Sequence, residues 1–294
     1  MAEHWKITPL RVGSFRLDGG AMFGVIPRFI WSHWISPDEN NRIPLAVRAL
    51  LLELGDQRVL VEAGYGDKWT ERERTIYEME RRTVVDALTE VGTSPPDISL
   101  VIVTHLHFDH VGGLTRAPAD RAADPSLTPE ECRPTFPRAR VVVQRREWDD
   151  ALANRSIMAR TYLPANLLPL HDQVQLVEGT AEILPGLSVQ PLGGHTPGQQ
   201  GVWIQTESGT VVFPGDLLPT RHHAHLSASL GYDMSSWETM QTTKAFLAQA
   251  RAENWQVALD HDPDFPLTMV GADAKGRWTL EPLCASGGAP ILRA

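Results

Sequence analysis

The sequence contains little cysteine. Only two of the 294 residues are cysteines, Cys132 and Cys284, and they lie far apart without a C-x-x-C pattern. A disulfide scaffold or a zinc site built from cysteines is therefore not expected, and both residues are predicted to be ordinary thiols. Any metal ion would need other ligands.

Long hydrophobic runs and an excess of positive charge are also missing. No stretch of about 18 apolar residues occurs, and the start, MAEHWKITPLRVGSF, lacks the basic patch and apolar core of a secretory signal. The formal net charge of −9 would repel phosphate backbones, and no stripe of lysine and arginine alternates with aromatic residues. These absences predict a cytoplasmic protein that binds neither a membrane nor nucleic acid.

Short apolar strands and helical segments alternate along the chain. Apolar runs typical of strands occupy residues 49–54, 58–63, 99–105, 139–144, 173–178, 181–192, 201–206, 209–216 and 255–262. One helix is expected to end near Val91, and two others are expected to cover residues 145–153 and 235–253. This rhythm predicts an α/β fold in which two similar halves form paired sheets covered outside by helices.

Two long segments fit no regular element. Residues 117–139 are rich in proline, and residues 19–44 are rich in aromatic and aliphatic side chains. The second segment is too apolar for a disordered loop, so it is expected to pack against the core, a partner subunit or a substrate. The residues after His261 resemble a turn and one strand.

Three of the eleven histidines cluster at the end of one predicted strand, in THLHFDHVGG. His105 and His107 would point to the same face of an extended strand because side chains alternate with period two. Asp109 and His110 follow in the expected turn. Imidazole and carboxylate groups are the ligands that zinc or a similar divalent ion prefers, so the cluster predicts a metal site.

Isolated histidines and an aspartate recur at later strand ends, within turns rich in glycine and proline. They are His195 in PLGGHTPGQ, Asp216 in VVFPGDLL and His261 in VALDHDP. The neighbouring turn residues leave each of these side chains free to bind. All three are therefore candidates for the same metal site.

These residues and their order resemble the metallo-β-lactamase superfamily, whose H-x-H-x-D-H motif is matched in full, and the resemblance extends from about Ile7 to His261. It implies one domain over residues 1–294, an αββα sandwich of two mixed β-sheets flanked by helices. Two divalent metal ions are implied, with zinc expected and manganese, iron or cobalt as alternatives. The implied ligands are His105, His107 and His195 for one metal, Asp109, His110 and His261 for the other, and Asp216 as the bridge.

The resemblance implies hydrolysis, in which a hydroxide shared by the two metals attacks a lactone or ester carbonyl and Asp109 carries the proton to the leaving group. Within the superfamily, the sequence is similar to N-acyl-homoserine lactonases in THLHFDHVGG, GGHTPGQ and FPGD. Pro219 stands where those lactonases usually have a tyrosine. The alternatives are an organophosphate or aryl ester hydrolase of the methyl parathion hydrolase type, a thioesterase like glyoxalase II, and a metal-stabilised binding protein without catalysis.

Two segments are expected to contact a small ester or lactone substrate. Met22 and Phe23, in the apolar segment near the N-terminus, would suit an acyl chain or an aryl group. His222, His225 and Tyr232 lie near Pro219 in the sequence and could supply the missing hydrogen bond. The stretch GVIPRFIWSHW also suits a contact between the subunits of a homodimer.

Overall fold

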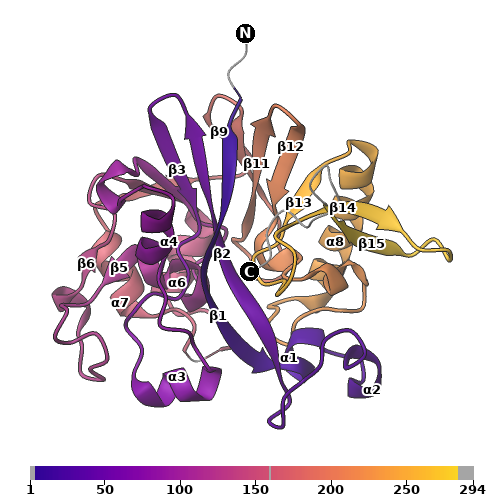
Figure 1. Ribbon diagram of the computed structural model, residues 1–294, viewed down its shortest axis with the longest axis horizontal. Coiled ribbons are helices and arrows are strands. Elements are labelled where there is room, and N and C mark those ends of the chain that lie inside the picture. The colour runs from indigo at the N-terminus through magenta and orange to yellow at the C-terminus, as the bar shows by residue number, and fades with distance from the viewer. Residues whose placement is uncertain (1–3, 159, 284–294) are drawn as a thin grey trace.

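The computed structural model describes residues 4–158 and 160–283. Two β-sheets pack face to face, and helices lie on their outer surfaces (Figure 1). The expected α/β sandwich of two mixed sheets is confirmed. Cys132 is buried and free, whereas Cys284 lies outside the described residues.

The first sheet has six strands in the order β1-β2-β3-β4-β7-β8. The first three pair antiparallel, and the later neighbours pair parallel. Parallel neighbours need crossover connections, which here carry helices on one face of the sheet. The strands are β1 (Lys6–Asp18), β2 (Arg42–Leu54), β3 (Gln57–Val61), β4 (Leu100–Ile102), β7 (Arg140–Gln144) and β8 (Val174–Val177), and the helices are α3 (Glu71–Tyr77), α4 (Val84–Glu90), α5 (Phe108–Val111), α6 (Arg145–Leu152) and α7 (Pro164–Leu167).

The second sheet has seven strands in the order β15-β14-β13-β12-β11-β10-β9. All neighbours are antiparallel except β12 and β13, which the long helix α8 (Ser236–Ala252) connects. The strands of this second sheet are β9 (Ala181–Leu184), β10 (Leu187–Pro191), β11 (Gln200–Thr206), β12 (Gly209–Phe213), β13 (Gln256–Ala258), β14 (Leu267–Ala272) and β15 (Trp278–Pro282). A small ribbon, β5 (Thr115–Arg116) with β6 (Arg133–Pro134), lies apart from both sheets.

The central strands are apolar on both faces because both faces are buried. On β2, Leu50 and Leu52 pack in the core between the sheets, together with Phe213 of the second sheet. Leu51, between them in the sequence, belongs to the core under the helices of the first sheet. Alternation of side chains along the strand thus serves two cores at once.

Strand β4 is shorter than expected. The prediction of a strand over residues 99–105 was wrong at its end, because the backbone N–H of Thr104 donates to the Glu62 carboxylate at 2.7 Å. His105 and His107 therefore project from a loop, and Asp109 lies in the first turn of α5. The ligand cluster is carried by a loop and a short helix, not by a strand and a turn.

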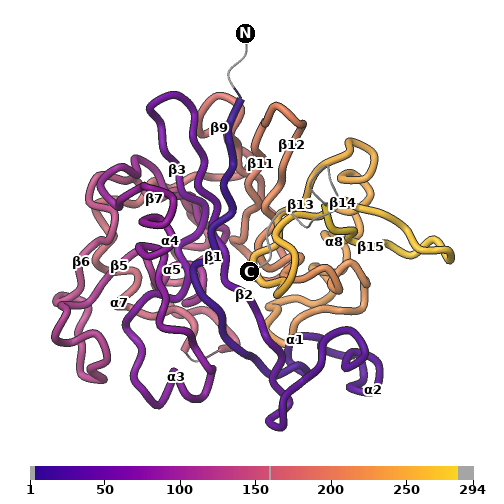
Figure 2. Tube along the Cα trace, in the orientation of Figure 1, coloured from indigo at the N-terminus to yellow at the C-terminus, as the bar shows by residue number. Residues whose placement is uncertain are grey.

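The segment of residues 19–44 is more regular than expected. It contains two short helices, α1 (Gly19–Phe23) and α2 (Arg28–Trp31). They lie next to the end of β1 and the start of β2 (Figure 2). The Asp18 side chain caps α1 by accepting from the Ala21 N–H at 2.9 Å. After His261 the chain forms two paired strands, β14 and β15, where one was expected.

Part of the stretch expected to form a dimer contact is exposed. Val25 and Phe29 are exposed, whereas Trp31 is buried. The dimer itself stays a prediction. In the described part of the chain, no helix is long and apolar enough to cross a membrane.

Candidate metal centre

Loops from both sheets bring the predicted ligands together at one end of the sandwich. The loop after β4 and helix α5 supply the first four, and loops after β10, β12 and β13 supply the others. Each of these segments follows a buried apolar strand, which fixes where its polar side chains lie. The side chains brought together are His105, His107, Asp109, His110, His195, Asp216 and His261.

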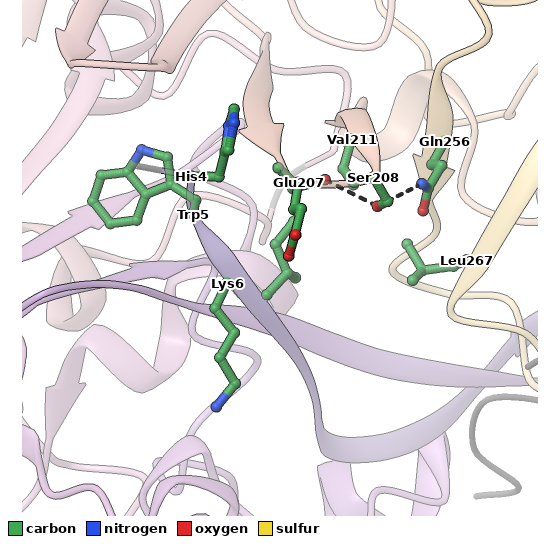
Figure 3. A pocket seen from close by; sticks show the side chains of 10 residues that line it. His4, Trp5, Lys6, Glu207, Ser208, Val211, Gln256 and Leu267 are labelled. Atoms are coloured by element: carbon green, nitrogen blue, oxygen red, sulfur yellow. Dashed lines mark hydrogen bonds between the residues drawn. The ribbon is translucent and has the colours of Figure 1, made fainter. Parts of the chain in front are cut away.

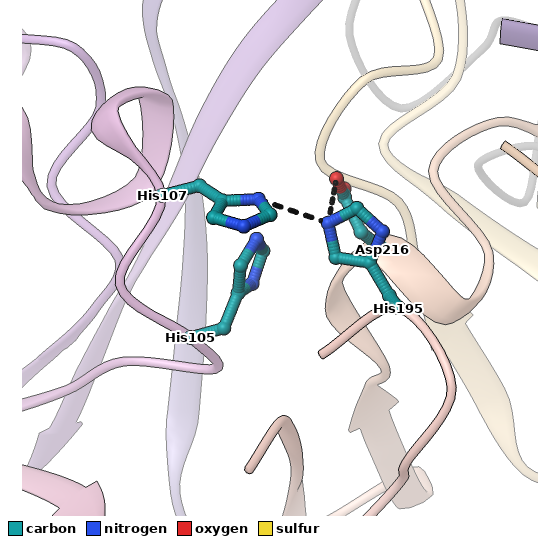
Figure 4. A group of neighbouring side chains, drawn as sticks. All are labelled: His105, His107, His195 and Asp216. Carbon is teal, nitrogen blue, oxygen red and sulfur yellow. Dashed lines mark hydrogen bonds and ion pairs between the residues drawn. The ribbon is translucent and has the colours of Figure 1, made fainter. Parts of the chain in front are cut away.

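The first group consists of His105, His107, His195 and Asp216, whose ligand atoms all lie within 4.8 Å of one another. His195 Nε2 lies 3.0 Å from His107 Nδ1 and 3.2 Å from Asp216 Oδ2. Figure 4 shows His105 and His107 on one side of this group and His195 on the other. All four side chains are buried.

The second group shares Asp216 with the first. Asp216 Oδ1 lies 3.3 Å from His261 Nε2 and 3.6 Å from His110 Nε2, so the two oxygens of this carboxylate face different groups. Asp109 Oδ2 lies 3.5 Å from His261 Nε2. Asp260, which was not among the predicted ligands, also belongs to this group.

The hydrogen bonding of the centre fits metal ligation. Among the described residues, the Nε2 atoms of His105, His110 and His261 and Oδ1 of Asp216 are buried without a hydrogen-bond partner. Leaving such an atom unpaired costs about 1–3 kcal/mol. The other ring nitrogen of His261 donates to the Ala46 carbonyl oxygen at 2.8 Å, a bond that orients the ring as is typical of metal-bound histidine. Divalent cations fit these donors.

The charges of the centre lead to the same conclusion. Burial and the neighbouring imidazoles hold the pKa of His105 and His107 well below its ordinary value, so both rings are neutral, the form that binds metals. Burial also disfavours the charged form of His261, but the carboxylates of Asp260 and Asp216 outweigh it and raise its pKa to about 9. The carboxylates around the second group therefore attract positive charge, which a cation would supply.

Several buried residues that support the ligands were not predicted. Asp233 accepts a hydrogen bond from His195 Nδ1 at 2.9 Å, and Glu147 contacts both ligand loops. Neither has a local sequence signal, because each lies far along the chain from its partner. Asp260 and Glu62 could have been noticed, since Asp260 precedes His261 directly and Glu62 is an acidic residue at the end of an apolar strand.

Glu62 has an unusual backbone. Its φ is +66°, in the left-handed region that a residue with a side chain rarely adopts. The side chain is buried and accepts from the Thr104 N–H, while Oε2 lies 3.5 Å from His110 Nδ1. Such strain persists only where the surroundings require it, and here it holds a carboxylate against the ligand loop.

A cavity of about 220 Å³ opens over the centre. Met22 and Tyr232, two of the residues predicted to contact substrate, line it, and Asp109, His195 and Asp216 lie in its wall. Pro219 does not line it, but its carbonyl oxygen accepts from the His261 N–H at 3.0 Å. The apolar and aromatic remainder of the wall comes from Leu17, Tyr77, Phe108 and Met158.

The other expected substrate residues lie outside the cavity. Phe23 is fully buried and stacks on Trp31 and His223, with ring centroids 5.7 and 5.2 Å away. His222 and His225 both pack against Trp34. The expectation that Phe23, His222 and His225 contact substrate is therefore corrected. Their aromatic packing ties the α1–α2 segment to the loop after Asp216.

A larger hollow, of about 650 Å³, lies at the other end of β12 (Figure 3). Lys6, Glu207 and Gln256 are among its lining residues. Neither group of candidate ligands lies there. Size is therefore a poor guide to the site in this protein, and the smaller cavity over the ligands is the candidate active site.

The fold and the donor set define a metal-binding αββα sandwich. The profile of the Metallo-beta-lactamase superfamily matches residues 42–261, which include all seven predicted ligands. The chain belongs to this superfamily.

Known relatives and solved structures agree with this assignment. An N-acyl homoserine lactonase of Bacillus thuringiensis is 29% identical over 191 residues, which cover 61% of this chain and 66% of the relative, just under two thirds of its length. A probable metal-dependent hydrolase from Staphylococcus aureus has a TM-score of 0.83 at 25% identity, over 97% of this chain and 100% of that one. AidC, a dizinc quorum-quenching lactonase, has a TM-score of 0.77 at 17% identity, over 98% of this chain and 97% of its own, and it supports the fold alone.

Proposed function

We propose that this protein is a metal-dependent hydrolase that opens lactone rings, with N-acyl homoserine lactones as the substrate class. The observation that carries the proposal is the pair of donor groups sharing Asp216 at the wall of a partly apolar cavity. The similarity to a curated N-acyl homoserine lactonase supports the choice of substrate.

Two divalent cations would be held there, one by the group around His105 and one by the group around His261. When bound, they would lower the pKa of a water molecule and polarise the carbonyl oxygen of the substrate. Zinc suits imidazole and carboxylate donors, although manganese, iron and cobalt share this preference.

The residues around the cavity have separate tasks in this proposal. Asp109 reaches both the second donor group and the cavity, where it can carry a proton to the departing alkoxide. Burial raises the pKa of Tyr232, so its hydroxyl stays protonated and can donate to a substrate oxygen in place of the tyrosine absent at Pro219. Met22 and Phe108 would hold the acyl chain away from water.

The second candidate is hydrolysis of an aryl ester or an aryl phosphotriester. The aromatic wall formed by Tyr77, Phe108 and Tyr232 favours it, because aromatic rings stack on aryl groups. A phenolate leaves with little protonation, so this reaction would depend less on Asp109.

Metal analysis with a substrate panel tests the proposal. Metal content per chain would be measured together with initial rates on an acyl-homoserine lactone, a nitrophenyl ester and an aryl phosphotriester. We expect two metals per chain and a lactone kcat/KM of about 10⁴ M⁻¹s⁻¹ or above. A protein with two metals that hydrolyses only the aryl substrates would replace the lactonase proposal by the second candidate. Absence of turnover on all three substrates would contradict both.

A further inference from the structure

The carboxylate of Glu147 lies between the two loops that carry the first donor group. Glu147 is in the first turn of α6 and is fully buried. Its Oε1 accepts from the Leu106 N–H at 2.9 Å and from the Tyr162 hydroxyl at 3.0 Å, and its Oε2 accepts from the Thr196 hydroxyl at 2.6 Å. One side chain thus joins segments about 40, 15 and 50 residues away in the sequence.

Each of these three donors adjoins a histidine of the first group. Leu106 stands between His105 and His107, and Thr196 directly follows His195. The ring of Tyr162 lies against that of His107, with centroids 5.4 Å apart. Glu147 is therefore bonded to the immediate surroundings of all three imidazoles without touching the ligand atoms.

A glycine supplies independent evidence that the His195 loop is pressed against α6. A Cβ at Gly198 would lie 2.3 Å from the backbone nitrogen of Glu147 and 2.5 Å from its Cα, a distance that no side chain tolerates. On the other side, a Cβ at Gly194 would lie 2.4 Å from the backbone nitrogen of Thr239 in α8. The loop is held between two helices, and at the contact with α6 Glu147 accepts a hydrogen bond from the Thr196 hydroxyl.

A buried carboxylate with no cationic hydrogen-bond partner is not explained by stability alone. Its three donors are all uncharged, so the burial of its negative charge is not offset by a bonded lysine or arginine. An ionised carboxylate can accept at both oxygens from three donors at once, which an amide cannot do. The negative charge would be favoured by a cation bound at the neighbouring imidazoles.

We propose that Glu147 is a positioning residue for the first metal: it sets the separation between the His105–His107 loop and the His195 loop. This inference rests on the metal-binding part of the proposed function and is independent of the substrate. Metal ligands must be held within about 0.5 Å of the geometry that binds the metal. Two loops from different sheets keep this geometry only if a common residue holds both.

Cobalt binding to Glu147→Gln tests the inference. Metal-free protein would be titrated with Co²⁺ while visible absorption is followed, and thermal unfolding of the metal-free forms would be recorded in parallel. Asp150→Asn is the matched control, because Asp150 is a buried carboxylate on the same helix whose partners are Arg146 and Arg155. We expect Glu147→Gln to weaken one of the two cobalt sites about 10- to 100-fold and to alter its spectrum, and Asp150→Asn to change neither.

Unchanged cobalt affinities and spectra in Glu147→Gln, whatever its thermal stability, would overturn the inference. Should that variant fail to fold, Thr196→Val removes only the bond on the His195 side and is judged by the same criteria. Lactone turnover of the unmodified protein is measured separately. Cobalt binding that depends on Glu147 in a protein without lactone turnover would contradict the substrate proposal alone, and lactone turnover with Glu147-independent cobalt binding would contradict this inference alone.

Discussion

At the scale of single residues, His195 is oriented by a carboxylate behind it. Its Nδ1 donates to Asp233 Oδ1 at 2.9 Å, and Oδ2 of Asp233 accepts from the Leu230 N–H at 3.0 Å. With one ring nitrogen committed to Asp233, Nε2 is left to face His107 and Asp216. Asp233 thereby fixes both the ring orientation and the tautomer that can bind a metal.

Asp109 should matter more for lactones than for aryl substrates. In Asp109→Asn, lactone turnover should fall about 100-fold or more, because an alkoxide leaving group needs a proton. Turnover of an aryl phosphotriester should fall less, since a phenolate leaves unprotonated. Rates on both substrates would be compared at measured metal content. Equal losses at full occupancy would argue against a proton-carrying role.

At the scale of elements, the α1–α2 segment is attached to the loop after Asp216 by aromatic packing. Phe23 stacks between Trp31 and His223, and His223 Nε2 lies 2.9 Å from the Met22 carbonyl oxygen. This packing fixes the backbone of Met22, whose side chain lines the cavity. The segment therefore shapes the substrate wall through residues that do not reach it.

Phe23→Ala should destabilise the protein by about 3–5 kcal/mol, because it leaves a cavity in a fully buried stack. Phe29→Ala is the matched control in the same segment: Phe29 is 81% exposed, and its loss should change the free energy of unfolding by no more than about 0.5 kcal/mol. Urea denaturation of both variants measures these values. Equal effects would contradict the buried packing of Phe23.

A half-buried lysine ties the loop before α3 to the chain after α5. Lys68 Nζ donates to the carbonyl oxygens of Gly112 at 2.6 Å and Thr115 at 2.5 Å. Burial lowers its pKa from 10.5 to about 8, although the nearby Asp67 and Cys132 favour the charged form. Between these two pH values, the unfolded chain binds a proton that the folded chain has released.

The contribution of Lys68 to the free energy of unfolding should therefore rise as the pH increases from about 8 to about 10.5, because the unfolded state binds more protons in this range. The free energy of unfolding would be measured from pH 7.5 to 9.5 for the unmodified protein and for Lys68→Met. The substitution should remove this contribution. Identical slopes for the two proteins would show that Lys68 titrates normally.

At the scale of the whole molecule, the two halves of the chain share the core between the sheets and one site. Trp5, directly before β1, packs against strands of both sheets. His261, in the loop after β13, donates a hydrogen bond to the carbonyl oxygen of Ala46 in β2. Neither half could bury these surfaces alone. We therefore propose that residues 1–294 form one domain.

Chelation should lower the thermal midpoint and leave a single unfolding transition. Both halves contribute ligands, so metal binding stabilises the folded chain as a whole. Scanning calorimetry with and without EDTA measures this, and added Zn²⁺ should restore the original midpoint. Two separate transitions would contradict the single domain, and an unchanged midpoint would contradict tight metal binding by the folded state.

From the sequence alone, the family, most strands of the two sheets and the seven candidate ligands could be predicted, but not the 13-residue strand β1 or the division of residues 181–192 into β9 and β10. Short patterns suffice for these predictions, because an apolar run indicates a buried strand. The spacing of the donor side chains likewise indicates a metal site, in His105, His107, Asp109 and His110. Which side chains act together depends on how the chain folds. Asp233 and Glu147 lie 38 and 41 residues from the ligand-loop residues they bond, and no local pattern records such a contact. Met22 and Phe23 are adjacent in the sequence, yet the packing of α1 turns one into the cavity and the other into the core.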